Sequence, residues 1–198
     1  MAVSSSGRGA TSSTSGGLTA AGLLYGLLSL AFVVLLKWTL IGRYKQRAVP
    51  MWTFFVWFSE AVTNLYEGVA VPNFLRYLRG TPWLPWALRL LGAKFGRGVY
   101  LDTTDITEFD CVSIGDYSEL NALCCPQTHL FEDRIMKIDQ VRIGERVTLG
   151  ARSTVLYGAQ VGDEARLGPL TLVMKGETLP AGSSWHGCPA MPQHRRVH

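Results

Sequence analysis

Residues 141–187 read VRIGERVTLGARSTVLYGAQVGDEARLGPLTLVMKGETLPAGSSWHG, with a large apolar residue at every sixth position. Neither an α-helix nor a β-strand repeats with that period. It is the period of a hexapeptide β-helix, in which each hexad forms one short parallel strand and a corner, and three hexads complete a triangular coil. The apolar series is Ile143, Leu149, Val155, Val161, Leu167, Val173, Leu179 and Trp185.

The residues between these apolar positions support the same interpretation. Glycine, which enters a tight corner without a Cβ clash, follows four of them. Side chains four places on also face the interior near a corner and should be small. They are Val147, Ser153, Ala159, Ala165, Thr171 and Ser183, with Glu177 as the exception. We therefore predict an all-β prism, a left-handed parallel β-helix, because hexapeptide prisms usually wind left-handed.

The apolar phase can be followed upstream, with one residue inserted between Leu101 and Ile114. Between Pro126 and Ile143 the register breaks, and the gap leaves room for one regular hexad and about eleven extra residues. We expect HLFEDRIMKIDQ, residues 129–140, to leave the coil as a loop, because loops on a rigid scaffold often carry function. The upstream positions in phase are Phe95, Leu101, Ile114, Leu120 and Pro126.

An uncharged apolar run extends from Leu18 to Leu36. As a helix it is long enough to cross roughly 30 Å of hydrocarbon. A cleaved signal sequence is the competing interpretation, but the run is long for one and no convincing cleavage site follows. Basic residues concentrate after the run, which predicts a single-pass membrane anchor with the β-helix on the cytoplasmic side. They are Lys37, Arg43, Lys45 and Arg47, whereas only Arg8 precedes the run.

The remaining regions complete a five-part organisation. Residues 1–17 are rich in Ser, Gly, Thr and Ala and are predicted not to fold. A transmembrane helix at 18–41 and amphipathic helices at 42–94 precede the β-helix at 95–190 and a tail at 191–198. Trp and Arg alternate with apolar groups in the second helical region. That pattern fits interfacial helices at the headgroup level, and equally a helical cap on the first coil.

Charge and cysteine usage restrict the partners. The formal net charge of +4 is modest, and its basic residues cluster beside the apolar run, which favours anionic membrane lipids over nucleic acid. None of the four cysteines forms a CxxC pair, and adjacent Cys124 and Cys125 are poorly placed to bridge each other. Reduced thiols in a cytosolic core are the simpler interpretation for these two, Cys111 and Cys188.

His129 stands where the regular coil gives way to the extra residues, and is followed closely by Glu132, Asp133 and Arg134. A histidine of near-neutral pKa can take a proton from an attacking amine, and a nearby carboxylate can fix its tautomer. We predict His129 as general base with Glu132 or Asp133 orienting it. The alternative is a histidine that only forms a hydrogen bond at the base of a loop.

A second polar concentration is the stretch LDTTDITEFD. Burial of a carboxylate is costly without a partner, and Asp105 occupies a predicted inward position. Either an ammonium group binds here, or the acids bond nearby threonines and Arg97. The predicted substrate-binding residues are Asp102, Asp105, Glu108, Asp110, Asn121 and Arg134. No metal site is expected, since His129 and His186 alone lie in the repeats and no HxxxxH spacing occurs.

From about Leu36 to Ala190 the sequence resembles the C-terminal region of membrane-bound, nonribosomal-peptide-synthetase-like enzymes of the poly-lysine synthetase type. The stretches that carry the resemblance are GRYK at 42–45, VPNFLRYLRGTPWLPWALRLLGAKFGRGVYLDTTDITEFD at 71–110, QTHLFEDRIMK at 127–137 and ARLGPLTLVMKGETLPAG at 165–182. In that family an adenylation domain and a carrier precede membrane helices and acyltransferase-like repeats that join amino-acyl units.

The resemblance implies an acyltransferase that forms amide bonds. Its acyl donor would be a carrier-bound phosphopantetheine thioester or a coenzyme A thioester, its acceptor an amine, and its base His129. The chain departs from the family pattern because it lacks the adenylation domain, the carrier and the earlier repeats. Two alternatives stay open: a non-catalytic scaffold that supports other synthetase modules, and a stand-alone acetyltransferase that forms a homotrimer.

Overall fold

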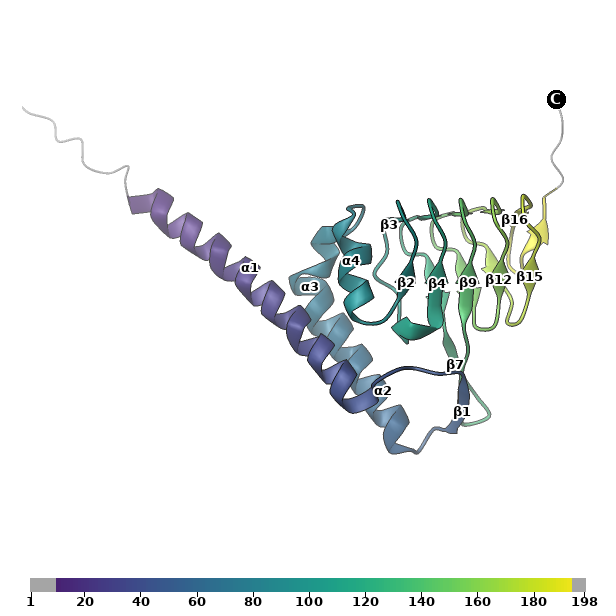
Figure 1. The fold of residues 1–198 in the computed structure, drawn as a ribbon, viewed down its shortest axis with the longest axis horizontal. Helices are drawn as coiled ribbons and strands as arrows, with labels where there is room; N and C mark the ends of the chain where they lie inside the picture. The colour runs from purple at the N-terminus through teal and green to yellow at the C-terminus, as the bar shows by residue number, and fades with distance from the viewer. Residues whose placement is uncertain (1–9, 194–198) are drawn as a thin grey trace, which may run out of the picture.

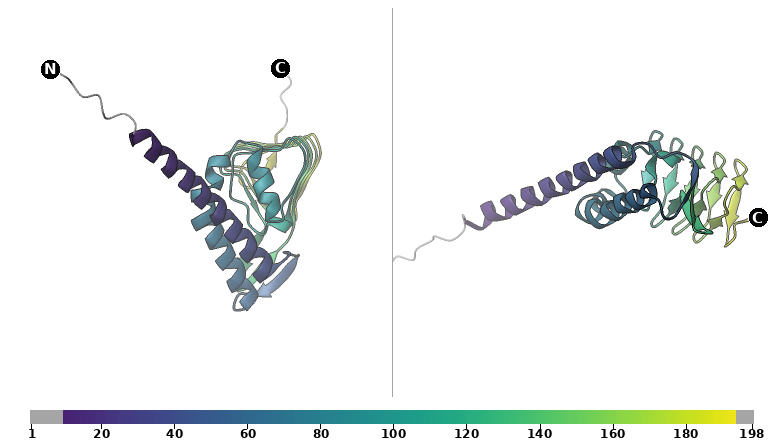
Figure 2. Two further views of the ribbon diagram at one scale, coloured as in Figure 1. Left: turned by 60° about the vertical axis from the view of Figure 1, so that its left-hand side comes forward. Right: turned by 90° about the horizontal axis from the view of Figure 1, so that it is seen from below.

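The computed structural model describes residues 10–193, and the C-terminal part of the chain is a triangular prism of stacked coils (Figures 1 and 2). Three sheets of parallel strands form its walls. One wall contains β2 (Lys94–Phe95), β4 (Val112–Ile114), β9 (Val141–Ile143), β12 (Gln160–Val161) and β15 (Thr178–Leu179). The second contains β3 (Tyr100–Leu101), β5 (Glu119–Leu120), β10 (Thr148–Leu149), β13 (Arg166–Leu167) and β16 (Ser184–His186). The third contains β6 (Cys125–Gln127), β11 (Thr154–Leu156) and β14 (Leu172–Val173).

Strand pairing follows the six-residue phase. Leu149 pairs with Leu120 on one side and with Leu167 on the other, so residues of one kind stack along the prism. Pairing of Leu101 with Leu120 absorbs the one-residue insertion where it was predicted. Ile114 pairs directly with Ile143, so the extra residues between them lie outside the coil. Both irregularities in the repeat are therefore confirmed at the predicted positions.

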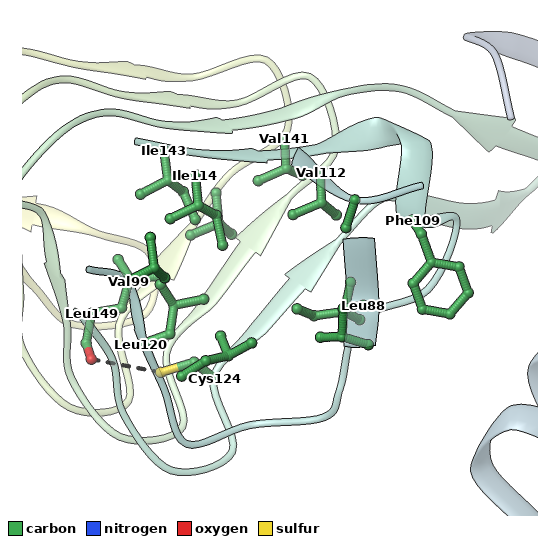
Figure 3. Packing of buried hydrophobic residues seen from close by; sticks show 14 of the residues in the cluster. Leu88, Val99, Phe109, Val112, Ile114, Leu120, Cys124, Val141, Ile143 and Leu149 are labelled. Carbon is green, nitrogen blue, oxygen red and sulfur yellow. Dashed lines mark hydrogen bonds between the residues drawn. The ribbon is translucent and has the colours of Figure 1, made fainter. Parts of the chain in front are cut away.

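The prism interior is apolar and close-packed (Figure 3). Leu120 and Leu149 have no exposed side-chain surface, and each buried side chain of this size stabilises the fold by about 1.5–3 kcal/mol. The corner positions hold small residues, as expected, because little space remains beside the ladders. The fully buried small residues are Val147, Ser153, Ala159 and Ala165, and Thr171 is 1% exposed.

The chain is not all-β, because helices occupy its N-terminal part. They are α1 (Ala10–Leu36), η1 (Lys37–Ile41), α2 (Phe54–Leu65), η2 (Tyr66–Ala70), α3 (Val71–Asn73), η3 (Leu75–Leu78) and α4 (Trp83–Leu90), and η4 (Phe109–Cys111) lies within the prism. Helix α1 begins at Ala10, inside the segment 1–17 that was predicted not to fold. Residues 1–9 of that segment lie outside the described residues, as does 194–198 of the predicted tail, whereas β17 (Met191–Pro192) pairs antiparallel with β16.

The helices cover the open end of the first coil (Figure 1). Leu84 and Leu88 of α4 are fully buried in the same apolar cluster as Leu101 of β3. Trp83 and Trp86 of that helix remain more than half exposed. Both interpretations of this region therefore have a structural basis, since one face of α4 caps the prism and the other presents aromatic side chains outward.

One helical segment, Thr19–Ile41, is long and apolar enough to cross a membrane. Only 22% of its most apolar window is buried inside the protein, whereas the core helix of a globular domain is mostly buried. Its outward surface carries large apolar side chains, among them Leu24, Phe32 and Leu35. Helix α1 runs diagonally away from the prism beside α2 (Figure 2).

The predicted loop at 129–140 leaves the coil, but it forms a β-hairpin. Strands β7 (His129–Glu132) and β8 (Ile135–Ile138) pair antiparallel, and β1 (Arg47–Pro50) pairs with the outer edge of β8. Asp133 and Arg134, between the two strands, both have positive φ, as the common two-residue hairpin turn requires. Met136 and Ile138 pack in a second small core with Tyr44, Val56 and Cys111. The sequence break therefore encodes a small sheet that joins the helices to the prism.

Candidate active site

His129 lies at the first position of β7, where the chain leaves the prism. Its Nδ1 atom is 2.8 Å from Oε2 of Glu108. The Glu108 side chain is completely buried, whereas that of His129 keeps 13% of its surface exposed. An imidazole ring with one nitrogen held by a carboxylate and part of its side-chain surface still accessible is an arrangement suited to proton transfer.

Glu108 lies in the irregular segment before η4 and has a left-handed backbone, with φ of 37°. Its Oε2 atom accepts hydrogen bonds from the hydroxyl groups of Thr128, at 2.6 Å, and Thr107, at 2.9 Å. Three donors thus surround one oxygen, which offsets the cost of burying a charge. The other oxygen, Oε1, is buried and has no hydrogen-bond partner among the described residues.

Two opposing influences act on the pKa of His129. Burial lowers this pKa. The hydrogen bond and negative charge of Glu108, together with the charge of Glu60, raise it by more than burial lowers it, so the pKa lies above its ordinary value of 6.5. Because Nδ1 is occupied by Glu108, the neutral ring carries its proton on Nδ1 and leaves Nε2 as the free base. The geometry therefore selects one tautomer.

Glu60 of α2 completes this charged group and was not identified from the sequence. Its Oε1 atom is buried without a hydrogen-bond partner among the described residues. Burial raises the pKa of Glu60, the charge of His129 lowers it, and Glu108 adds to the increase. No motif signals this residue, because α2 contacts the site only through the tertiary packing of the helices.

The structure does not bring Glu132 or Asp133 to His129. Successive side chains of a strand point to opposite faces, so His129 and Phe131 share one face of β7, with ring centroids 5.5 Å apart, and Glu132 lies on the other. Glu132 pairs with Lys137 at 2.8 Å and Lys175 at 2.6 Å, which lower its pKa to about 2.

Asp133 and Arg134 are exposed at the hairpin turn. Both lie at the end of the hairpin remote from the first residue of β7. The backbone carbonyl of Arg134 accepts a hydrogen bond from the amide of Met51, which ties the turn to the start of the helical region. These two residues therefore contribute to the junction between hairpin and helices in this structure.

The acidic stretch 102–110 does not form a single cluster. Asp102 lies 3.4 Å from Arg79, and Asp105 is exposed, not inward, because the irregular coil after Leu101 buries Thr103 in its place. Asp110 accepts a 2.6 Å hydrogen bond from the fully buried ammonium group of Lys37. Only Glu108 faces His129.

Asn121 has a structural partner on the prism wall. Its side-chain amide donates to the carbonyl of Leu149 at 2.8 Å, which extends the ladder between neighbouring coils. Four free thiols are present, and those of Cys111 and Cys124 are buried. Within residues 10–193 no three His, Cys, Asp or Glu side chains are placed to hold a metal ion.

Comparison with known proteins places this geometry in context. The family model described as "Hexapeptide repeat of succinyl-transferase" matches residues 140–168. Over 175 residues the chain is 64% identical to the Delta-poly-L-ornithine synthetase of Acinetobacter baumannii strain AB307-0294. The alignment covers 88% of this chain and 13% of the synthetase, so the chain corresponds to a small part of that relative's length. The predicted resemblance to poly-amino-acid synthetases is confirmed.

The solved structures that the chain resembles are more distant in sequence. The hexapeptide-repeat acetyltransferase VCA0836 of Vibrio cholerae O1 biovar eltor, complexed with acetyl coenzyme A, is 14% identical with a TM-score of 0.47, and the match covers 54% of this chain and 62% of that chain. Soybean serine acetyltransferase complexed with serine is 20% identical with a TM-score of 0.42, over 70% and 62% of the two chains. At such identities the likeness concerns the fold alone.

Proposed function

We propose that the chain is a membrane-anchored acyltransferase module that forms an amide bond from a thioester, with His129 as general base and Glu108 as the residue that orients it. The hydrogen bond from the His129 ring to the buried carboxylate of Glu108 is the observation that carries this proposal. The hexapeptide repeat and the synthetase name of the relative support the reaction class. We further propose that the prism winds left-handed.

The reaction is aminolysis of a pantetheine thioester, carried by coenzyme A or by a carrier protein. The neutral amine of the acceptor attacks the thioester carbonyl carbon, and Nε2 of His129 takes the proton that the nitrogen loses. The carbon–sulfur bond then breaks, and the thiolate leaves with the proton returned by the imidazolium. The products are one amide and one thiol.

Glu108 serves two purposes in this scheme. Its Oε2 atom fixes the ring through Nδ1, and its negative charge stabilises the imidazolium that forms during the transfer. The hydroxyl groups of Thr107 and Thr128 hold the carboxylate in turn. In this proposal Glu108 therefore takes the orienting role that the sequence suggested for Glu132 or Asp133.

The remaining acidic residues are proposed to contact the acceptor only at the outer surface. Asp102 is half-buried and Asp105 is exposed, whereas Asp110 is already paired with Lys37. Asn121 and Arg134 are further polar candidates on the prism wall and the hairpin turn. We propose anchoring by the Thr19–Ile41 segment, with the prism on the cytoplasmic side because the basic residues follow the segment.

The test is aminolysis by the purified chain in detergent. The substrates are ornithyl and lysyl thioesters of coenzyme A and of a pantetheinylated carrier, with free diamines as acceptors, and amide product is measured by mass. His129→Ala should lower turnover by a factor on the order of a hundred or more. His186→Ala is the matched control, since His186 is an exposed histidine on β16, and should leave turnover unchanged. Equal turnover of all three proteins would remove His129 from catalysis.

A scaffold role is the second candidate. It is favoured by the positions of Glu132 and Asp133, which turn away from His129, and by the small share of the relative that the chain covers. A scaffold would show no aminolysis alone and would restore activity to the remaining synthetase modules even as the His129→Ala variant. Sedimentation in detergent would separate this module from a homotrimeric acetyltransferase.

A further inference from the structure

A basic pocket of about 470 Å³ lies where the end of the apolar helix meets the prism. Its only acidic lining residue is Asp110, whose carboxylate is already paired with the buried ammonium group of Lys37. The pocket therefore has excess positive charge available for an anion. The basic residues that line it are Arg43, Lys45, Arg89 and Lys94.

An apolar groove of about 780 Å³ lies between α1 and α4. Its lining is almost entirely apolar, and it is partly open to the surface. In a membrane-anchored protein such a groove faces hydrocarbon, and its apolar lining can pack against an acyl chain. The side chains that line it include Leu27, Val34 and Leu35 of α1, Phe74, and Trp83 and Trp86 of α4.

The two cavities adjoin at Trp38 and Leu90. The indole nitrogen of Trp38, which lines the basic pocket, donates a 2.9 Å hydrogen bond to the carbonyl of Leu90, which lines the groove. The preceding residue, Arg89, lines the basic pocket and donates to the carbonyls of Phe95 and Gly96. A single molecule with an anionic end and an apolar end can therefore occupy both cavities.

The order of the cavities along the chain matches a membrane. Groove residues Leu27 to Leu35 lie within the segment Thr19–Ile41, and the basic residues Arg43 and Lys45 lie beyond its end. The nine residues from Leu27 to Leu35 span about 12 Å along the helix axis, close to the roughly 15 Å of one hydrocarbon leaflet. Along the chain Trp38 lies between the groove residues and the basic residues, where the apolar segment ends, and indole rings prefer the membrane interface.

We propose that one anionic glycerophospholipid binds at this junction, with its phosphate in the basic pocket and an acyl chain in the groove. A zwitterionic lipid fits less well, because its choline or ethanolamine group adds a positive charge beside four cationic side chains. The site is separate from His129, and it rests on the proposed membrane anchoring. Its occupant would hold α1 against α4 and so fix the helical cap relative to the membrane surface.

The test uses the full chain in nanodiscs of phosphatidylcholine with a minority of phosphatidylglycerol, extracted into detergent and measured by native mass spectrometry. The charge variant is Lys45→Gln with Lys94→Gln, and its control is Arg97→Gln with Arg152→Gln, two exposed arginines outside the pocket. The groove variant is Ala31→Phe, which fills the groove, and its control is Ala20→Phe on the same helix.

We expect one retained phosphatidylglycerol per wild-type chain, and a loss of about tenfold or more in its retention for the charge variant. The groove variant should also lose the retained phosphatidylglycerol, and both controls should match the wild type. Equal retention by the charge variant and its control, or equal retention of the two lipids by the wild type, would overturn the proposal. Membrane flotation is measured in parallel, and loss of flotation by the wild type would refute the anchoring itself.

Discussion

The regular prism and the junction that joins it to the helices bury different kinds of side chain. From β9 to β16 the interior consists of apolar ladders, and its buried polar residues are Ser153 and Thr171, both uncharged. The junction buries ionisable groups, namely Lys37 and Glu108, each paired with a residue distant in sequence. The coils of the prism stack without buried charges. The buried charges of the junction are therefore not needed for stacking and require another explanation.

The difference suggests a division of roles. The prism gains its stability from the apolar area buried at each hexad, so this stability is spread over many similar contacts. The junction depends on two specific pairs, Lys37 with Asp110 and His129 with Glu108, and removal of one partner from either leaves a buried charge or an unoriented ring. Loss of the pair Lys37 with Asp110 should lower the stability of the fold, and loss of the pair His129 with Glu108 should lower turnover.

The largest expected effect is on stability, at the first of these pairs. Asp110→Asn leaves the fully buried Lys37 ammonium without its counter-charge and should destabilise the protein by about 3–5 kcal/mol. Denaturant unfolding in detergent measures it. The double variant Lys37→Met with Asp110→Leu removes both charges and should recover most of the loss, whereas additive losses would show that the pair is not coupled.

A prism substitution should be almost as costly to stability but silent in chemistry. Leu149→Ala removes a fully buried ladder residue and should destabilise the fold by about 2–5 kcal/mol. Turnover per folded molecule should stay the same, because Leu149 packs in the prism interior, whereas His129 lies where β7 leaves the prism. A specific loss of turnover would break the proposed division between scaffold and junction.

Glu108→Gln should lower turnover by about ten- to a hundredfold, since the amide still accepts a hydrogen bond from the ring but provides no charge. Thioester aminolysis measures the loss. Glu60→Gln is the comparison, because Glu60 interacts with His129 without a hydrogen bond, and we expect a smaller effect. A larger effect at Glu60 would reverse the assignment of the orienting residue.

The pH dependence should report the same pair. Activity requires the neutral ring, so kcat/KM should rise with pH through a midpoint above 6.5, and Glu108→Gln should move that midpoint down. The contribution of the pair to stability changes with pH in the opposite direction to activity, because the pKa of His129 is raised on folding. The contribution of the pair is fully present below pH 6.5 and is lost as pH rises through the folded pKa. The same midpoint of kcat/KM in the wild type and in Glu108→Gln would contradict this assignment.

The smallest expected effect is at Glu132. Glu132→Gln removes its ion pairs with Lys137 and Lys175 at the partly exposed surface of the hairpin, and turnover should change by less than about twofold. A loss comparable to that of Glu108→Gln would restore Glu132 as the orienting carboxylate. Rates of the two variants in one assay decide between them.

The sequence predicts the prism well because each hexad repeats the same local requirement. Residues such as Leu149 and Ala165 are specified by period alone, and even the insertion before Ile114 and the break before Ile143 have the predicted sizes. The pairs of the junction have no such period. Lys37 and Asp110 are separated by 73 residues, and they meet only because the helices fold back onto the first coil.

The break in the register beside His129 made it a candidate from the sequence, whereas Glu108 was predicted to bind substrate and not to contact His129. Glu108 lies in an irregular segment with a left-handed backbone, where the phase that places Asp105 inward no longer holds. The alternation of β7 explains why Glu132, although near in sequence, points elsewhere. Once the break is known to form a hairpin, that alternation alone excludes Glu132 from the face of His129.

The most direct measurement is a titration of His129 by ¹⁵N NMR in detergent, assigned by comparison with the His129→Ala variant. We predict that the neutral ring carries its proton on Nδ1, that its midpoint lies above 6.5, and that Glu108→Gln lowers this midpoint. A midpoint at or below 6.5 that Glu108→Gln leaves unchanged, or a neutral ring protonated on Nε2, would contradict the assignment of His129 and Glu108 as the acid–base pair.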